Sequence, residues 1–231
     1  AFYNRDASSP KLSPRYAFKR IRSDSAFPSS QLQWGAYMRD SLSLKIKEGV
    51  CEYELCPNTN IASDKDFLAF TITPNMTNNA RKYTGGSYIY VTNGGRTENE
   101  KFEDIVRYMA EQNDGVKVGV TWRTSFNDAR RTGIVPTQPP SGDVLGHDMF
   151  AVAWKKINGH EYLGFRNSFG ETWGDKGRIW LPKGFFKISS AIAYIPPVKP
   201  LNEEIIKPVQ KPAERDEFAE KAKAQELRKM L

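Results

Sequence analysis

Apolar positions that recur every three to four residues dominate the first half of the chain and predict helices there. Ser13 offers an N-terminal cap and Pro14 suits the first helical position of the earliest of these segments. In the last segment Phe102, Ile105 and Val106 fall on one helical face. The predicted helices cover residues 16–21, 35–48, 75–83 and 99–113.

The second half of the chain is rich in β-branched and aromatic residues, which favour strands. The Ile157-Asn158-Gly159-His160 stretch has the chemistry of a two-residue hairpin turn, so His160 is expected to be exposed. The predicted strands are 87–92, 116–122, 149–156, 161–166 and 177–181. Because helices come first and strands follow, the pattern predicts an α+β fold and not alternating α/β units.

The composition changes at Pro196. Five prolines punctuate residues 196–213, which predicts a linker, and residues 214–231 are charged with apolar positions at near-helical spacing. An isolated helix of this length is marginal in water, so we expect it to dock on a protein partner, on the domain itself or on a longer chain. The predicted organisation is therefore a domain at 1–195, a linker and a C-terminal helix.

Composition and charge bear on three classes of protein: nucleic-acid-binding proteins, membrane proteins and metalloproteins. The net charge is +7, but most basic residues are mixed with acidic ones, which is typical of a solvated surface and not of a specific nucleic-acid site. No run of about 18 apolar residues predicts a membrane span. Cys51 and Cys56 are poorly spaced for zinc and leave a local disulfide and two free thiols as alternatives. No metal or organic cofactor is expected.

His147 stands where an apolar strand begins, and Asn167 follows the next strand. Alone, His147 would be interpreted as a packed core histidine. Together, an imidazole and an amide on adjacent antiparallel strands suit a thiol-imidazole site, in which the amide oxygen holds the ring in one tautomer. Trp173 could cover that hydrogen bond from water and strengthen it.

The segment GHDMFAVAW…YLGFRNSFGETWGDKGRIWLP resembles the papain family of cysteine peptidases. The resemblance implies that His147 is the catalytic histidine, that Asn167 orients it, and that Gly146 and Trp173 support the site. Phe169 replaces the usual tryptophan. Asp148 replaces a small apolar residue, and its carboxylate could raise the imidazole pKa or bind elsewhere.

Upstream, LSPRYAF and GAYMRDSLSLKIKEGVCEYELCP look like a microbial branch of the same family, so the resemblance covers about residues 12–186. It implies a two-lobe papain-like fold, with a helical lobe that is truncated here and a β-rich lobe that holds the histidine and asparagine. In the family the nucleophilic cysteine opens a helix that precedes the LSPR segment. Neither Cys51 nor Cys56 opens a helix after a glycine-rich turn, so neither is predicted to be the nucleophile.

Two hypotheses follow from the resemblance. The first is a peptidase that cleaves polypeptides by a Cys-His-Asn mechanism, with the cysteine on a segment outside this chain. The second is a catalytically inactive papain-like module that binds a protein partner within a larger assembly, for example a virion. The persistence of His147, Asn167 and Trp173 favours the first. Substrate specificity and cellular location are left open by the sequence.

Overall fold

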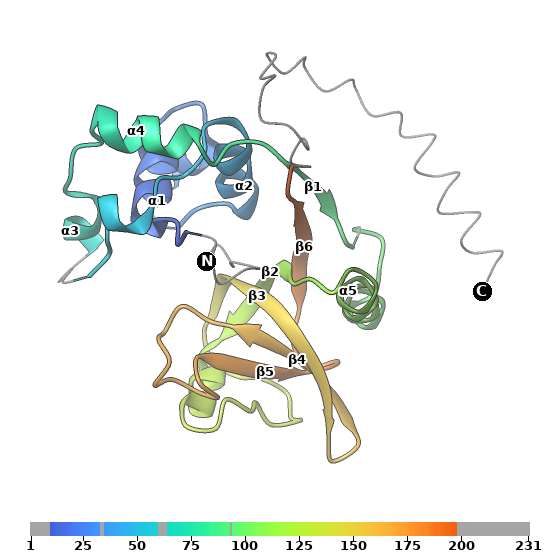
Figure 1. Cartoon of the computed structure of the whole chain (residues 1–231). Helices are drawn as coiled ribbons and strands as arrows, with labels where there is room; N and C mark the ends of the chain where they lie inside the picture. Colours follow the sequence, from blue (N-terminus) through green and yellow to red (C-terminus); the bar gives the residue numbers. More distant parts are fainter. Residues whose placement is uncertain (1–9, 33–34, 60–63, 93, 198–231) are drawn as a thin grey trace. The chain divides into compact units, whose positions relative to one another are not determined.

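The computed structural model describes residues 10–32, 35–59, 64–92 and 94–197 (Figure 1). The described helices are α1 (Pro14–Ser23), α2 (Met38–Lys47), α3 (Asp64–Leu68), α4 (Pro74–Arg81) and α5 (Glu98–Gln112), with 3-10 turns at Pro28–Gln31, Tyr53–Leu55 and Thr124–Arg130. The predicted C-terminal helix and the linker beyond Pro197 lie outside the described residues, so the division into domain, linker and helix stays a prediction. Each helix that the structure describes is too short or too polar to cross a bilayer.

Helix α1 forms as its sequence predicts. The Ser13 hydroxyl accepts a hydrogen bond from the Tyr16 amide at 3.0 Å, and Pro14 occupies the first turn. Helix α2 begins at Met38, three residues later than predicted, because Gly35 adopts a left-handed φ of 73° that no right-handed helix can include. The buried faces of α1 and α2 share one core cluster that also contains Val50, Cys51 and Cys56.

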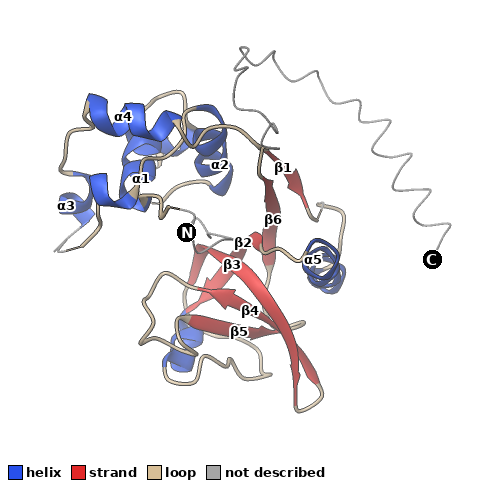
Figure 2. Cartoon of the chain, in the orientation of Figure 1, coloured by secondary structure: helices blue, strands red, loops and turns tan. Residues whose placement is uncertain are grey.

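Six strands form one antiparallel sheet in the order β1-β6-β2-β3-β4-β5 (Figure 2). Their bounds are β1 (Ser87–Tyr90), β2 (Val116–Arg123), β3 (Val144–Ile157), β4 (His160–Arg166), β5 (Arg178–Pro182) and β6 (Ile188–Ile195). The Asn158-Gly159 hairpin turn is confirmed, with φ of 50° and 82°, and His160 is exposed. The helices and the antiparallel sheet confirm the predicted α+β class.

Two features of the sheet differ from the prediction. Strand β6 was not predicted, because Ser189 and Ser190 interrupt its apolar run and hide its alternation. Strand β3 starts at Val144 and not at residue 149, because β2 continues to pair with it as far as Arg123. As a result His147 lies inside a paired strand, opposite Val120, and not on a loop before it.

Helix α5 packs on the face of the sheet that holds the main core. Phe102 and Ile105 are buried there with Val116, Val118 and Val120 of β2, as the predicted helical face requires. The backbone amide of Ile188 donates to Glu98 at 2.6 Å, and Lys101 donates to the Ile188 carbonyl at 2.9 Å. These bonds fix α5 to β6. On the other face of the sheet, Lys117 Nζ of β2 donates to Ser41 Oγ of α2 at 2.7 Å.

Candidate active site

His147 is surrounded by aromatic rings. Its imidazole meets Trp122 edge-on with 5.0 Å between centroids, and it stacks on Phe169 at 5.6 Å with 22° between the ring planes. His147 itself belongs to β3, Trp122 comes from β2, and Phe169 comes from the loop that follows β4. Three separate segments therefore hold the imidazole ring. The imidazole is half-buried and its plane is fixed by this packing.

Asn167 faces the histidine from the end of β4. Its Oδ1 lies 2.9 Å from His147 Nε2 and also accepts a hydrogen bond from the Ser168 backbone amide at 2.8 Å. The second bond identifies Oδ1 as the oxygen of the amide group, because a backbone N–H can only donate. His147 Nε2 must then carry the proton, which leaves Nδ1 as the basic nitrogen of the neutral ring.

A glycine-rich loop brings Trp173 into the aromatic cluster around His147. The Trp173 ring lies 5.2 Å from Phe169 and 6.4 Å from Trp122, so it closes the aromatic cluster. The loop is tied to its surroundings by the Gly174 amide, which donates to the Arg130 carbonyl at 2.7 Å. Gly174 has a left-handed φ of 61°, and a Cβ there would lie 2.4 Å from the Arg178 carbonyl oxygen. Glycine is required at this position to seat Trp173.

Gly146 is the remaining residue that the sequence predicted to support the site. Gly146 is exposed on β3 next to His147, and a Cβ there would meet nothing within 4 Å, so the structure gives no steric reason for glycine. Phe126 is buried against Trp122. The contact of Trp122 with the imidazole was not predicted, because it depends on the pairing of β2 with β3.

Asp148 does not lie beside the imidazole. It pairs with Gly119 on β2, whereas His147 pairs with Val120, so the two side chains leave opposite faces of the sheet. Desolvation raises the pKa of the Asp148 carboxyl, and the charges of Lys117 and His147 act in the opposite direction. The strand geometry directs this carboxylate to the face opposite His147, and both roles that the sequence left open for it remain predictions.

The two cysteines are buried free thiols within the α1-α2 cluster, which resolves the alternatives of thiol and disulfide. Burial raises the pKa of Cys51 to about 12 and also raises the pKa of Cys56. Such thiols are poor nucleophiles at neutral pH. Neither belongs to the core cluster that contains Trp122 and Trp173.

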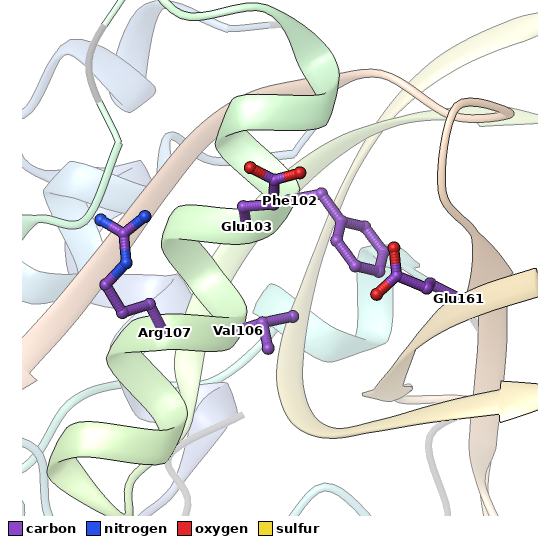
Figure 3. A pocket seen from close by; sticks show the side chains of 5 residues that line it. All are labelled: Phe102, Glu103, Val106, Arg107 and Glu161. Atoms are coloured by element: carbon purple, nitrogen blue, oxygen red, sulfur yellow. The ribbon is translucent and has the colours of Figure 1, made fainter. Parts of the chain in front are cut away.

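A pocket lies between α5 and β4 and contains none of the residues around His147; it is lined by Phe102, Glu103, Val106, Arg107 and Glu161 (Figure 3). Lys183 forms ion pairs beside it with Glu103 at 2.7 Å and Glu161 at 3.0 Å. No group of three or more His, Cys, Asp or Glu side chains that could hold a metal ion occurs in the part of the chain that the structure describes.

Known structures share this architecture. Xylellain, a cysteine protease from Xylella fastidiosa, superimposes with a TM-score of 0.63 at 18% identity, over 81% of this chain and 70% of that one. The bromelain protease from Ananas comosus, solved with the E64 inhibitor, gives 0.55 at 16% identity, over 84% and 81%. Digestive procathepsin L 3 from Tenebrio molitor larval midgut gives 0.56 at 17% identity, over 80% of this chain and 56% of that one.

These similarities confirm the papain-like fold. The chain spans little more than half the length of the procathepsin. A search of curated proteins found no match. The model of the papain family cysteine proteases matches residues 34–194, which is more than half of the sequence and includes His147, Asn167 and Trp173. The chain therefore belongs to the papain family of cysteine proteases.

Proposed function

We propose that this chain carries the histidine-asparagine part of a cysteine peptidase that cleaves polypeptides, with the nucleophilic cysteine on a segment outside this chain. The observation that supports the proposal most is the contact between His147 Nε2 and Asn167 Oδ1 at 2.9 Å, with Oδ1 fixed by Ser168. This arrangement selects the tautomer that leaves Nδ1 free to exchange a proton with a thiol.

The chemistry follows from that tautomer. His147 Nδ1 takes the thiol proton, and the resulting thiolate attacks the peptide carbonyl carbon. The imidazolium then gives its proton to the leaving amine, and an acyl-enzyme remains. Water attacks the acyl-enzyme with His147 as the base, which releases the carboxylic acid and restores the thiol. Asn167 holds the ring at the same nitrogen through every step.

The aromatic rings around the pair supply a further argument. Phe169 and Trp173 reduce the access of water to the hydrogen bond between His147 and Asn167, and a polar contact in a drier environment is stronger. We assign Trp173 this shielding role. Gly146 would support the site through its backbone in β3, since no side chain is excluded there.

The placement of the nucleophile follows from the cysteines that are present. Cys51 is fully buried and has a pKa near 12, and Cys56 is buried in the same cluster. A nucleophile must instead reach the imidazole and have a lowered pKa. The helical lobe would thus be completed by a cysteine-bearing helix, as in the microbial branch that the upstream segments resemble.

The proposal is tested with the natural protein at its full length. We expect it to hydrolyse a fluorogenic peptide, and we expect His147→Ala to abolish that hydrolysis while His160→Ala, a change at an exposed turn, leaves it unaltered. Loss of hydrolysis after thiol alkylation would identify cysteine chemistry. A full-length protein that cleaves no peptide would point instead to the non-catalytic module, whose partner would be a protein.

A further inference from the structure

A row of mainly basic side chains crosses the sheet on the face opposite the main core. Ala151, Phe165 and Ile179 are paired across β3, β4 and β5 and are buried in the main core cluster. Successive residues of a strand point to opposite faces, so the neighbouring row points away from that core. This row, which we call the basic row, consists of Lys117 of β2, Phe150 of β3, Arg166 of β4 and Arg178 of β5.

The two arginines of the basic row lack a strong counter-charge. Arg166 and Arg178 are directly paired across β4 and β5, and like charges at such positions repel each other. Arg166 Nη2 lies 3.6 Å from Glu171 Oε1, but the Glu171 side chain is 83% exposed, so this ion pair contributes little. Arg178 has no ion-pair partner among the described residues. An acidic group from outside those residues would therefore stabilise the two arginines.

The helical lobe already covers one end of the basic row. Lys117 Nζ donates to Ser41 Oγ of α2 at 2.7 Å, so α2 lies over the row where the row crosses β2. Met38 and Leu42 of α2 also pack with Ile192, the residue of β6 that pairs with Lys117. These contacts establish that helices of this lobe pack on the face of the sheet that carries Arg166 and Arg178.

We infer that the cysteine-bearing helix docks on the basic row through an aspartate or glutamate that binds Arg166 and Arg178. The inference rests on the proposed peptidase function, which requires that helix to complete the helical lobe. A guanidinium group binds a carboxylate through short, charge-assisted hydrogen bonds. His147 lies three residues from Phe150 on β3, which is about 10 Å along the strand. A helix rises about 1.5 Å per residue, so the acidic residue would lie about two turns from the cysteine.

The first test locates the partner of Arg166 without measuring activity. Arg166→Lys keeps the positive charge and supplies an amine that a zero-length carbodiimide couples to a contacting carboxylate. In the natural full-length protein we expect a crosslink from position 166 to an aspartate or glutamate about two turns from the nucleophilic cysteine. Arg131→Lys, a change at an exposed arginine, should give no such crosslink. The absence of a crosslink to that segment, or a crosslink only to Glu171 or to another protein, would overturn the inference.

A charge reversal supplies the second test. Arg178→Glu should lower the unfolding temperature of the full-length protein by about 4 °C more than Arg131→Glu does, and the difference should shrink in about 1 M salt. Replacing the crosslinked acidic residue with arginine should restore the stability of Arg178→Glu. Equal effects of the two reversals, or no restoration, would overturn the inference. Peptide hydrolysis without the crosslink would overturn it and leave the proposed function standing, whereas the crosslink without hydrolysis would support the docking and remove the proposed activity.

Discussion

In the side-chain amide of Asn167, the oxygen has hydrogen-bond partners and the nitrogen has none among the described residues. Its Oδ1 lies 2.9 Å from His147 Nε2 and 2.8 Å from the Ser168 amide nitrogen, whereas its Nδ2 is buried and finds no acceptor among the described residues. A buried donor without a partner costs about 1–3 kcal/mol, so the position is not optimised for stability. Residues that lower stability are expected where function demands them.

Replacing Asn167 with alanine should separate activity from stability. Because the loss of two hydrogen bonds is offset by removal of the unpartnered Nδ2, the free energy of unfolding should change by less than about 1 kcal/mol. Peptidase activity should fall about 100-fold, since the imidazole is no longer held. Asn167→Asp keeps an acceptor for Nε2 and should recover part of the activity. Denaturation curves and steady-state kinetics measure both quantities, and a large loss of stability with unchanged activity would refute this account.

The tautomer of His147 can be observed directly. With ¹⁵N-labelled histidine, NMR should show a proton on Nε2 of His147 that exchanges slowly with water, while the exposed His160 should exchange fast. Trp173→Ala should speed the exchange at His147 because it opens the aromatic cover. A proton found on Nδ1 of the neutral ring would contradict the assigned geometry.

Two glycines that flank the site should respond differently to alanine. Gly174→Ala should destabilise the protein by about 2 kcal/mol or more, because φ is 61° and the new Cβ would lie 2.4 Å from the Arg178 carbonyl oxygen. Gly146→Ala should change the unfolding free energy by less than about 0.5 kcal/mol, because nothing lies within 4 Å of its Cβ. Urea denaturation of both variants provides the comparison, and equal effects would argue against the loop geometry.

Burial of Cys51 should make stability depend on pH in the alkaline range. Its thiol pKa is about 12 in the folded chain and about 8.5 when unfolded, so above pH 8.5 the unfolded state loses a proton that the folded state keeps. The contribution to stability is complete below pH 8.5 and is lost as pH rises, by up to about 1.4 kcal/mol per unit.

The control is Cys51→Ala, which removes the titrating group. The difference in unfolding free energy between wild type and variant should be constant from pH 6 to 8 and should shrink between about pH 8.5 and 10. Denaturation midpoints across this range measure it. A difference that stays constant to pH 10 would mean that Cys51 ionises equally in both states.

The sequence predicted those parts of the fold that local chemistry determines. The Ser13 cap, the amphipathic face of α5 and the Asn158-Gly159 turn all formed as expected, because each depends on residues within a few positions of one another. The pairing of His147 with Asn167 followed from a family motif, and the structure places the two in contact.

The missed features depend on strand register. The edge-on contact of Trp122 with the imidazole requires knowing which residues of β2 and β3 are paired. Strand alternation alone would have placed Asp148 on the face opposite His147. β6, with its serine pair, gave no periodic signal from which its own register could be read.

The most direct test of the central claim is the rate at which iodoacetamide alkylates cysteines of the natural full-length protein near pH 6. We predict one fast-reacting cysteine that is neither Cys51 nor Cys56, and a rate that falls by orders of magnitude in His147→Ala, because the imidazolium no longer stabilises the thiolate. A protein with no fast-reacting cysteine, or one whose alkylation rate is unaffected by His147→Ala, would contradict the proposed Cys-His-Asn site.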